Sequence, residues 1–315
     1  MTNKIGKIIF RLLIALLLLL TFLPVSSPLA VNAEEVSRHK VTVTTSFLED
    51  IVLKIVEDTV DLSLIIPAGS DPHLYNASAG DLSKILDADL LLYHGLNFEA
   101  QMATALEDYG VSVTDNFDPA DLITVSEASD EVDPHYWFDL SLYQESVIAA
   151  RDYLVEAFPE EAEFYTENTE DYLSELADLD VWLEETLAQL PVEERILVTP
   201  HDAFAYFALS NQFTVYAPQG ISTESEVSND AIIQTVTFII ENHVPAIFLD
   251  TTSNPQAMEK LQEGVAQLGA EVLVVGGQDQ ALYSDSLAPS GQANDNYIDM
   301  YRHNVSLIVE HLTQD

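Results

Sequence analysis

The stretch that decides the fold is residues 161–190, EAEFYTENTEDYLSELADLDVWLEETLAQL. Apolar residues recur in it at steps of three and four, the period of one helix face. They are Tyr165, Tyr172, Leu176, Leu179, Leu183, Leu187 and Leu190, with Thr169 at the missing step. Pro159 and Pro191 bracket the run, which predicts a helix of about 30 residues, ~45 Å long if fully helical.

Short apolar runs alternate with helical patterns on both sides of this stretch. The predicted strands are residues 41–45, 60–66, 89–93, 196–199, 213–216, 246–250 and 271–275. Such alternation is typical of an α/β fold with mainly parallel sheets, whose ligands gather at the carboxyl ends of the strands. The long helix then belongs either to a single domain or to a backbone that joins two lobes. We favour the second interpretation, because the segments on its two sides are alike in kind.

The resulting domain prediction has four parts. They are a signal peptide (1–33), an N-terminal α/β lobe (34–158), a connecting helix (159–190) and a C-terminal α/β lobe (191–315). Lys4, Lys7 and Arg11 precede an apolar run from Leu12, and cleavage is expected after Ala33. The protein is therefore expected to be exported, either periplasmic, extracellular or at the cell surface. Retention through an uncleaved signal segment is the alternative.

The composition restricts the chemistry. The sequence contains no cysteine, which excludes disulfides, thiolate metal sites, cysteine nucleophiles and a lipidated N-terminal cysteine. Asp and Glu number 53 against 11 Lys and Arg, for a formal net charge of −42. Nucleic acid and anionic lipid are poor partners for such a polyanion. The acidic surface is explained either by solubility in saline or alkaline surroundings or by attraction of cations, which salt would screen.

Three of the eight histidines lie in loops next to prolines, which restrict the backbone. Two of them share a tripeptide, in Asp71-Pro72-His73 and Asp133-Pro134-His135, and His201 follows Pro200 at the end of a predicted strand. Without cysteine, a metal site must use nitrogen and oxygen donors, and these three imidazoles are candidates for it. His94 also follows a strand, but we interpret it as a structural histidine. Tyr136 and Trp137 are expected to pack against the cleft.

Five motifs occur in the order and spacing of a known family. They are Asp71-Pro72-His73, Asp133-Pro134-His135-Tyr136-Trp137, His201-Asp202-Ala203-Phe204, Gln219-Gly220-Ile221-Ser222-Thr223 and Tyr283-Ser284-Asp285-Ser286-Leu287. From residue 41 to 311 the chain resembles the zinc/manganese solute-binding proteins of bacterial metal ABC importers (TroA-like, cluster A-I, solute-binding protein family 9). The resemblance implies two α/β lobes, one rigid connecting helix and a metal site between the lobes.

Carried over motif by motif, the resemblance implies His73 and His135 as ligands from the first lobe, and His201 and Asp285 from the second. Three imidazoles and a carboxylate suit one Zn²⁺ and also accept Mn²⁺ or Fe²⁺. The zinc-specialised branch of the family has a long His-rich loop in the first lobe. The corresponding residues here, 115–133, are acidic and contain no histidine. This departure weakens a dedicated zinc-scavenger interpretation.

The function implied is therefore that of a non-enzymatic, extracytoplasmic protein that captures a zinc or manganese ion and delivers it to a membrane ABC permease. A monomer is expected. One alternative is a zinc hydrolase using the same histidines, although no His-Glu-x-x-His or Ser-His arrangement supports it. The other is a surface adhesin on this scaffold. Asp71 and Asp133 are expected either to orient the neighbouring imidazoles or to cap their own turns.

Overall fold

The structure is a computed structural model that describes residues 38–126, 129–277 and 280–313. The predicted signal peptide (1–33) lies outside these residues. The described part belongs to one compact unit, Arg38–Asp315. We call residues 38–158 the first lobe and residues 191–313 the second lobe. These boundaries stay a prediction, since the contacts within the unit do not separate the two lobes.

The first lobe is built on a four-stranded parallel sheet with the order β2-β1-β3-β4. Its strands are β1 (Lys40–Val43), β2 (Asp61–Leu64), β3 (Leu90–Tyr93) and β4 (Val111–Ser112). Its crossover helices are α2 (Ser46–Val56), α3 (Ala79–Asp87) and α4 (Ala103–Tyr109), with a short 3₁₀ turn, η2 (Ala100–Met102), before α4. β1 is central and its side chains from Val41 to Val43 are buried, as expected for a strand covered on both faces.

The acidic segment before Asp133 is not wholly a loop. It contains an antiparallel pair, β5 (Thr124–Ser126) with β6 (Ser129–Val132). The sequence analysis did not predict this pair or β4. Strands of two to four residues carry too little alternation for a period to be recognised. The short 3₁₀ turn η3 (Tyr136–Phe138) follows β6 and leads into α5 (Leu140–Ala157).

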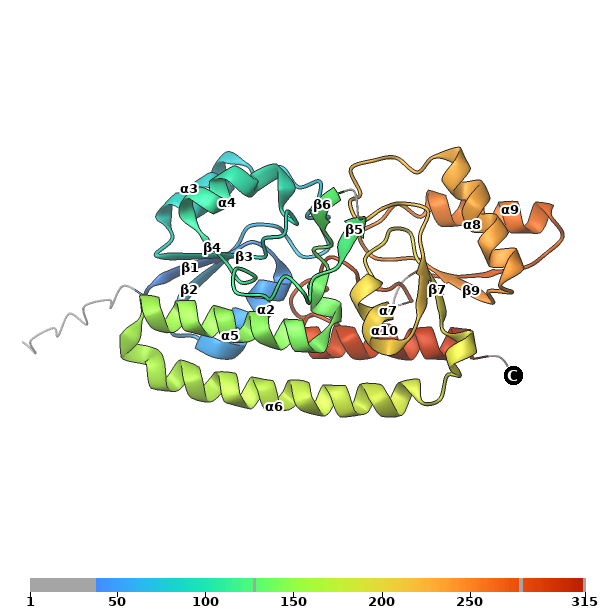
Figure 1. Cartoon of the computed structure of the whole chain (residues 1–315). Coiled ribbons are helices and arrows are strands. Elements are labelled where there is room, and N and C mark those ends of the chain that lie inside the picture. Colours follow the sequence, from blue (N-terminus) through green and yellow to red (C-terminus); the bar gives the residue numbers. More distant parts are fainter. Residues whose placement is uncertain (1–37, 127–128, 278–279, 314–315) are drawn as a thin grey trace, which may run out of the picture. The chain divides into compact units, whose positions relative to one another are not determined.

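The long helix is confirmed as α6 (Ala162–Leu187), with 26 residues. It is shorter than the predicted segment 159–190 at both ends. At the N-terminal end Pro159 opens a separate 3₁₀ turn, η4 (Pro159–Glu161), and at the C-terminal end the helix stops at Leu187. Its predicted apolar face is the buried face, from Tyr165 to Leu187. α6 packs against α2, α5 and α10, and Figure 1 shows it passing beneath strands of both lobes.

The second lobe has two parallel strand pairs, β7 (Ile196–Val198) with β8 (Thr214–Tyr216) and β9 (Ala246–Phe248) with β10 (Leu273–Val275). β7 lies next to β9. Its other elements are η5 (Val192–Glu194), α7 (Ala205–Asn211), α8 (Asn229–Glu241), α9 (Gln256–Gln267) and α10 (Tyr297–Leu312). The strands are thus mainly parallel in both lobes, as predicted.

One hydrophobic core connects the lobes. A single cluster of buried apolar side chains includes Val41 from β1, Tyr172 from α6, Leu197 from β7 and Tyr301 from α10. Two smaller clusters lie within the individual lobes. Of the helices in the described ranges, none combines the length and the apolar character needed to span a bilayer.

Candidate metal centre

The four predicted ligands converge. His73, His135, His201 and Asp285 each offer one donor atom, and these atoms all lie within 4.8 Å of one another. His73 is 3% exposed, and the other three side chains are 0% exposed. Residues 212 positions apart in the chain therefore meet in a single buried cluster, which can hold one metal ion.

Each ligand stands in a connection that leaves a strand. His73 and His135 follow β2 and β6, and His201 follows β7, where it forms an isolated parallel bridge with Gln219. Asp285 follows Leu282, which forms a similar bridge with Asp250 beyond β9. Parallel strands present their carboxyl ends at one edge, which gathers the loops of His73, His201 and Asp285 from positions far apart in sequence. His135 instead follows β6, a strand of the antiparallel pair.

The two Asp-Pro-His tripeptides form the same local turn. Asp71 Oδ1 accepts the amide N–H of His73 at 2.9 Å, and Asp133 Oδ1 accepts that of His135 at 3.0 Å. Only Asp133 also contacts its imidazole, with Oδ1 2.6 Å from His135 Nδ1. Of the two predicted roles, Asp71 therefore caps its turn, while Asp133 caps its turn and orients the ring.

His201 has an equivalent partner that the sequence analysis missed. Asp250 Oδ2 lies 3.0 Å from His201 Nδ1, and it also accepts the hydroxyl of Ser253 at 2.9 Å. Asp250 Oδ1 accepts the amide N–H groups of Thr252 and Ser253. The available signal was its position at the end of predicted strand 246–250, where ligand-proximal side chains gather in parallel sheets.

These carboxylates leave the other ring nitrogens aimed at the centre. His135 Nε2 lies 3.4 Å from Asp285 Oδ1, and His201 Nε2 lies 3.2 Å from Asp285 Oδ2. These are ion-pair distances, yet the Nε2 atoms of all three histidines and Asp285 Oδ1 have no hydrogen-bond partner. Buried polar atoms are normally paired, because leaving one unpaired costs about 1–3 kcal/mol. A metal ion would satisfy all four atoms.

The charges of the cluster also fit a cation. Burial lowers the pKa of His73 to about 3, so this ring is neutral and its lone pair is free. Burial also opposes a charge on His135, but the carboxylates of Asp133 and Asp285 outweigh it and raise its pKa to about 9. The pKa of His201 is likewise raised by Asp285 and Asp250 against the effect of burial. Despite burial, the two imidazolium charges hold the pKa of Asp285 well below its usual value. Protons on His135 and His201 thus stand where a metal would bind.

Aromatic rings enclose the first-lobe side of the cluster. Phe98 lies edge-on to His73 with ring centroids 5.0 Å apart, and Trp137 contacts His135 at 5.2 Å. Trp137 and Tyr136 are fully buried, which confirms that they are packing residues. A dry wall of this kind strengthens electrostatic interactions within the site.

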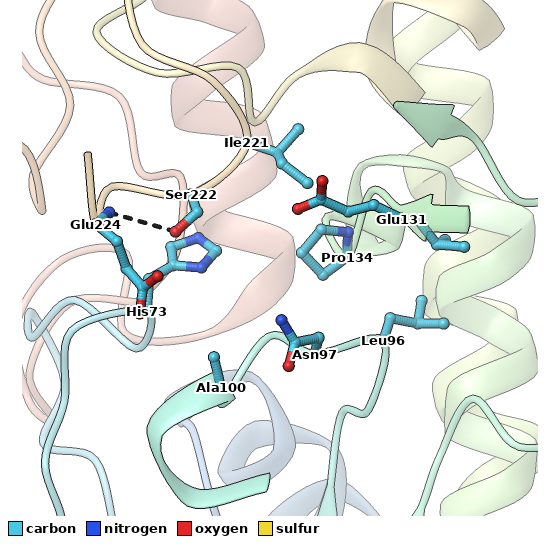
Figure 2. A pocket seen from close by; sticks show the side chains of 10 residues that line it. His73, Leu96, Asn97, Ala100, Glu131, Pro134, Ile221, Ser222 and Glu224 are labelled. Carbon is cyan, nitrogen blue, oxygen red and sulfur yellow. Dashed lines mark hydrogen bonds between the residues drawn. The ribbon is translucent and has the colours of Figure 1, made fainter. Parts of the chain in front are cut away.

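A cavity of about 430 Å³ reaches the cluster at His73. Figure 2 shows its lining, which comes from both lobes. The first lobe contributes Asn97 and Pro134 among others, and the second contributes Ser222 and Glu224. Of the four predicted ligands, His73 alone lines this cavity, so it gives solvent a route to one side of the centre.

Comparison with known proteins yields one family and several relatives. The family model of ZnuA, the periplasmic zinc-uptake complex component A, matches residues 41–311. The zinc-binding protein TroA of Treponema pallidum (strain Nichols) is 34% identical over 279 residues, covering 87% of this chain and 89% of its own. The manganese-binding lipoprotein MntA of Bacillus subtilis (strain 168) is 33% identical over 278 residues, with coverage of 87% and 89%.

Solved structures agree with this result. A structure of a TroA protein, from a study of its metal-binding specificity, superposes with a TM-score of 0.86 at 51% identity. The superposition covers 88% of this chain and 100% of the TroA chain. Since the family model spans nearly every described residue and the relatives match over most of their length, the chain belongs to the ZnuA family of periplasmic metal-binding proteins.

Proposed function

We propose that this protein is the extracytoplasmic solute-binding protein of a metal ABC importer, and that it captures one divalent transition metal ion and delivers it to the membrane permease. Its family membership supports this function. The observation that carries it is the buried cluster. Its four convergent donor atoms lie within 4.8 Å of one another, and the Nε2 atoms of the three histidines have no hydrogen-bond partner.

The ligands in this proposal are the Nε2 atoms of His73, His135 and His201 and the carboxylate of Asp285. With one carboxylate oxygen the site is tetrahedral, the geometry that Zn²⁺ adopts in protein sites. With both oxygens it offers five donors, which suits the higher coordination of Mn²⁺ or Fe²⁺. The relatives are named for zinc in one case and for manganese in the other, and we propose these two metals as the cargo.

We further propose that the protein is not an enzyme. Catalytic zinc sites keep one coordination position for water, with three protein ligands. Here four protein donors surround the same point, and all four side chains are buried. This arrangement favours holding an ion over hydrolysis, and the family members named above are binding proteins. No observation favours the adhesin alternative.

We also propose that the protein is exported and acts as a monomer. All four donors come from a single chain, so a second copy is not needed to complete the site. The MntA relative is named a lipoprotein, whereas the present sequence has no cysteine to carry a lipid. The proposal therefore places the protein outside the cytoplasm without a lipidated cysteine.

The test is a metal-binding titration. The purified protein is stripped with a chelator and titrated with Zn²⁺ and Mn²⁺, separately and in competition, while bound metal is counted. We expect one equivalent per chain, lost or greatly weakened in His201→Ala and Asp285→Ala. The absence of stoichiometric binding of either ion would refute the proposed function, and the competition would rank the two metals.

A further inference from the structure

The segment that carries Asp285 belongs to the second lobe by its position in the sequence, yet several of its hydrogen bonds are made with first-lobe residues. The amide N–H of Leu287 donates to Ser46 Oγ at 2.9 Å. The hydroxyls of Ser46 and Ser286 lie 3.2 Å apart. Ser46 is the first residue of α2 and is 5% exposed, so these bonds form away from competing water. They fix the backbone immediately after Asp285 to a first-lobe helix.

Two more first-lobe residues hold the same segment. The amide N–H of Gly69 donates to Ser286 Oγ at 2.7 Å. The indole N–H of Trp137 donates to the carbonyl oxygen of Ser284 at 3.0 Å. Together with Ser46, these donors bracket Asp285 on both sides. Hydrogen bonds at 2.7–3.0 Å are well-formed. The bonds of Trp137 and Ser46 are buried, so breaking either leaves a buried polar group unpaired, whereas that of Gly69 is part-buried.

From Ser284 onward, the hydrogen bonds of this segment to the second lobe are fewer and longer than those to the first lobe. Before it, Tyr283 is held by the second lobe, because its amide N–H donates to Asn304 Oδ1 at 2.9 Å and its carbonyl oxygen accepts a hydrogen bond from Asn304 Nδ2 at 2.8 Å. Leu282 still pairs with β9, since its amide N–H donates to the carbonyl of Leu249 at 2.8 Å. Beyond it, the hydroxyl of Thr252 lies 3.1 Å from Ser284 Oγ and 3.4 Å from Asp285 Oδ2. The change of attachment therefore falls between Tyr283 and Ser284, just before the ligand.

His201 behaves in the opposite way. Its ring is held by Asp250, and its carbonyl oxygen accepts the hydroxyl of Thr199 at 2.9 Å. Its backbone bridges to Gln219. All of these partners belong to the second lobe.

We propose that Asp285 works with His73 and His135 as one preassembled half-site attached to the first lobe, and that Ser46 is the positioning residue that holds Asp285 there. His201 is then the one ligand of the four that the second lobe carries by itself. The half-site, with two imidazoles and one carboxylate, receives the divalent ion, and His201 completes the coordination. This inference rests on the proposed metal-binding function.

The experiment compares Ser46→Ala with Ser146→Ala in the purified protein. Ser146 is a buried control outside the Asp285 segment. It is 0% exposed, and its hydroxyl donates to the carbonyl of Tyr143 within α5 and also contacts the side chain of Tyr136. Zn²⁺ and Mn²⁺ affinities are measured by competition titration, and the thermal midpoint of the metal-free protein is recorded. We expect Ser46→Ala to weaken the binding of both ions about tenfold. This is the lower end of the loss of metal affinity typical for residues that orient a ligand. Ser146→Ala is expected to leave both affinities within about twofold, with a comparable loss of thermal stability.

A double-mutant cycle separates positioning from a general structural effect. In the Asp285→Ala background, Ser46→Ala is expected to have no further effect on metal affinity, because the group that it positions is gone. In the His201→Ala background its effect is expected to persist at about tenfold. Equal effects in the two backgrounds, or an affinity of Ser46→Ala equal to that of Ser146→Ala, would overturn the inference.

The proposed function and this inference fail differently. If the wild-type protein binds one equivalent of metal and Ser46→Ala binds it equally well, only the preassembled half-site is refuted. If the wild-type protein binds no metal, the function itself is refuted. Should Ser46→Ala not fold, Ser286→Ala removes the hydroxyl that joins Ser46 and Gly69 to this segment, and the same cycle applies to it.

Discussion

Two buried histidines of the first lobe have nearly the same surroundings and different hydrogen bonding. His94 and His135 are 1% and 0% exposed. Both contact Phe98 and Trp137, with ring centroids between 5.2 and 5.9 Å apart. Burial and aromatic neighbours therefore do not distinguish a structural histidine from a ligand.

The difference lies in the second ring nitrogen. His94 Nε2 lies 2.7 Å from Thr45 Oγ1, and its Nδ1 lies 2.9 Å from Tyr136 Oη, so both nitrogens are satisfied. His135 is held by Asp133 at Nδ1, while its Nε2 has no hydrogen-bond partner. A buried imidazole with one nitrogen fixed and the other unpaired is oriented to donate a lone pair, which is the arrangement of a metal ligand.

The largest effect is expected from His135→Ala. Loss of this ligand removes a donor and leaves Asp133 buried without its partner, so affinity for Zn²⁺ and Mn²⁺ is expected to fall by more than about 100-fold, beyond the range for outer residues. Competition titration with counting of bound metal measures it. Retention of wild-type affinity would show that the unpaired Nε2 does not mark a ligand.

Acid is expected to weaken binding through the same nitrogen. The pKa of His135 is raised to about 9 and that of His201 is also raised, so at neutral pH a metal must displace a proton from each ring. Affinity should therefore fall as pH falls below about 9, by about tenfold per pH unit for each displaced proton.

His73, with its pKa lowered to about 3, and Asp285, with its pKa well below its usual value, do not compete with the metal in this range. Calorimetric titration in buffers of different ionisation enthalpy counts the released protons. A pH-independent affinity between 6 and 8, with no proton release, would contradict this prediction.

A smaller effect is expected from Asp250→Asn, which tests whether a carboxylate on Nδ1 is what prepares an imidazole for binding. The substitution keeps the shape but removes the charge that orients His201 and raises its basicity. Metal affinity is expected to fall about 10- to 100-fold. Asp81→Asn is the control, because Asp81 is also buried but its carboxylate accepts hydrogen bonds from Ser78, at the start of α3, and from Tyr75. Equal affinities of the two variants would disprove the orienting role.

The smallest effect on metal binding is expected from His94→Ala. The change leaves the hydroxyls of Thr45 and Tyr136 without their partner and opens a cavity, at a cost of about 2–4 kcal/mol in the free energy of unfolding. Denaturant unfolding measures that loss. Metal titration of the same variant should still give one equivalent, and loss of the metal in a folded His94→Ala protein would remove the distinction between the two histidines.

The sequence by itself determined the long helix and the architecture. The apolar period from Tyr165 to Leu187 survives as the buried face of α6, because a helix face with the right period must be buried whatever packs against it. The buried strands β1, β3, β7 and β9 were likewise visible as short apolar runs. The resemblance of five motifs implied all four residues of the cluster, and His94 was correctly interpreted as structural.

Only the tertiary structure decided the partners. Asp250 lies 49 positions from His201, and Ser46 lies 241 positions from Leu287, so no local pattern connects them. A short side chain such as Ser46 has no periodic signal, and its role depends on what the fold brings within 3 Å. Sequence patterns record which residues are buried together along one element. The hydrogen bonds that hold ligands in place form between elements, and they exist only once the chain has folded.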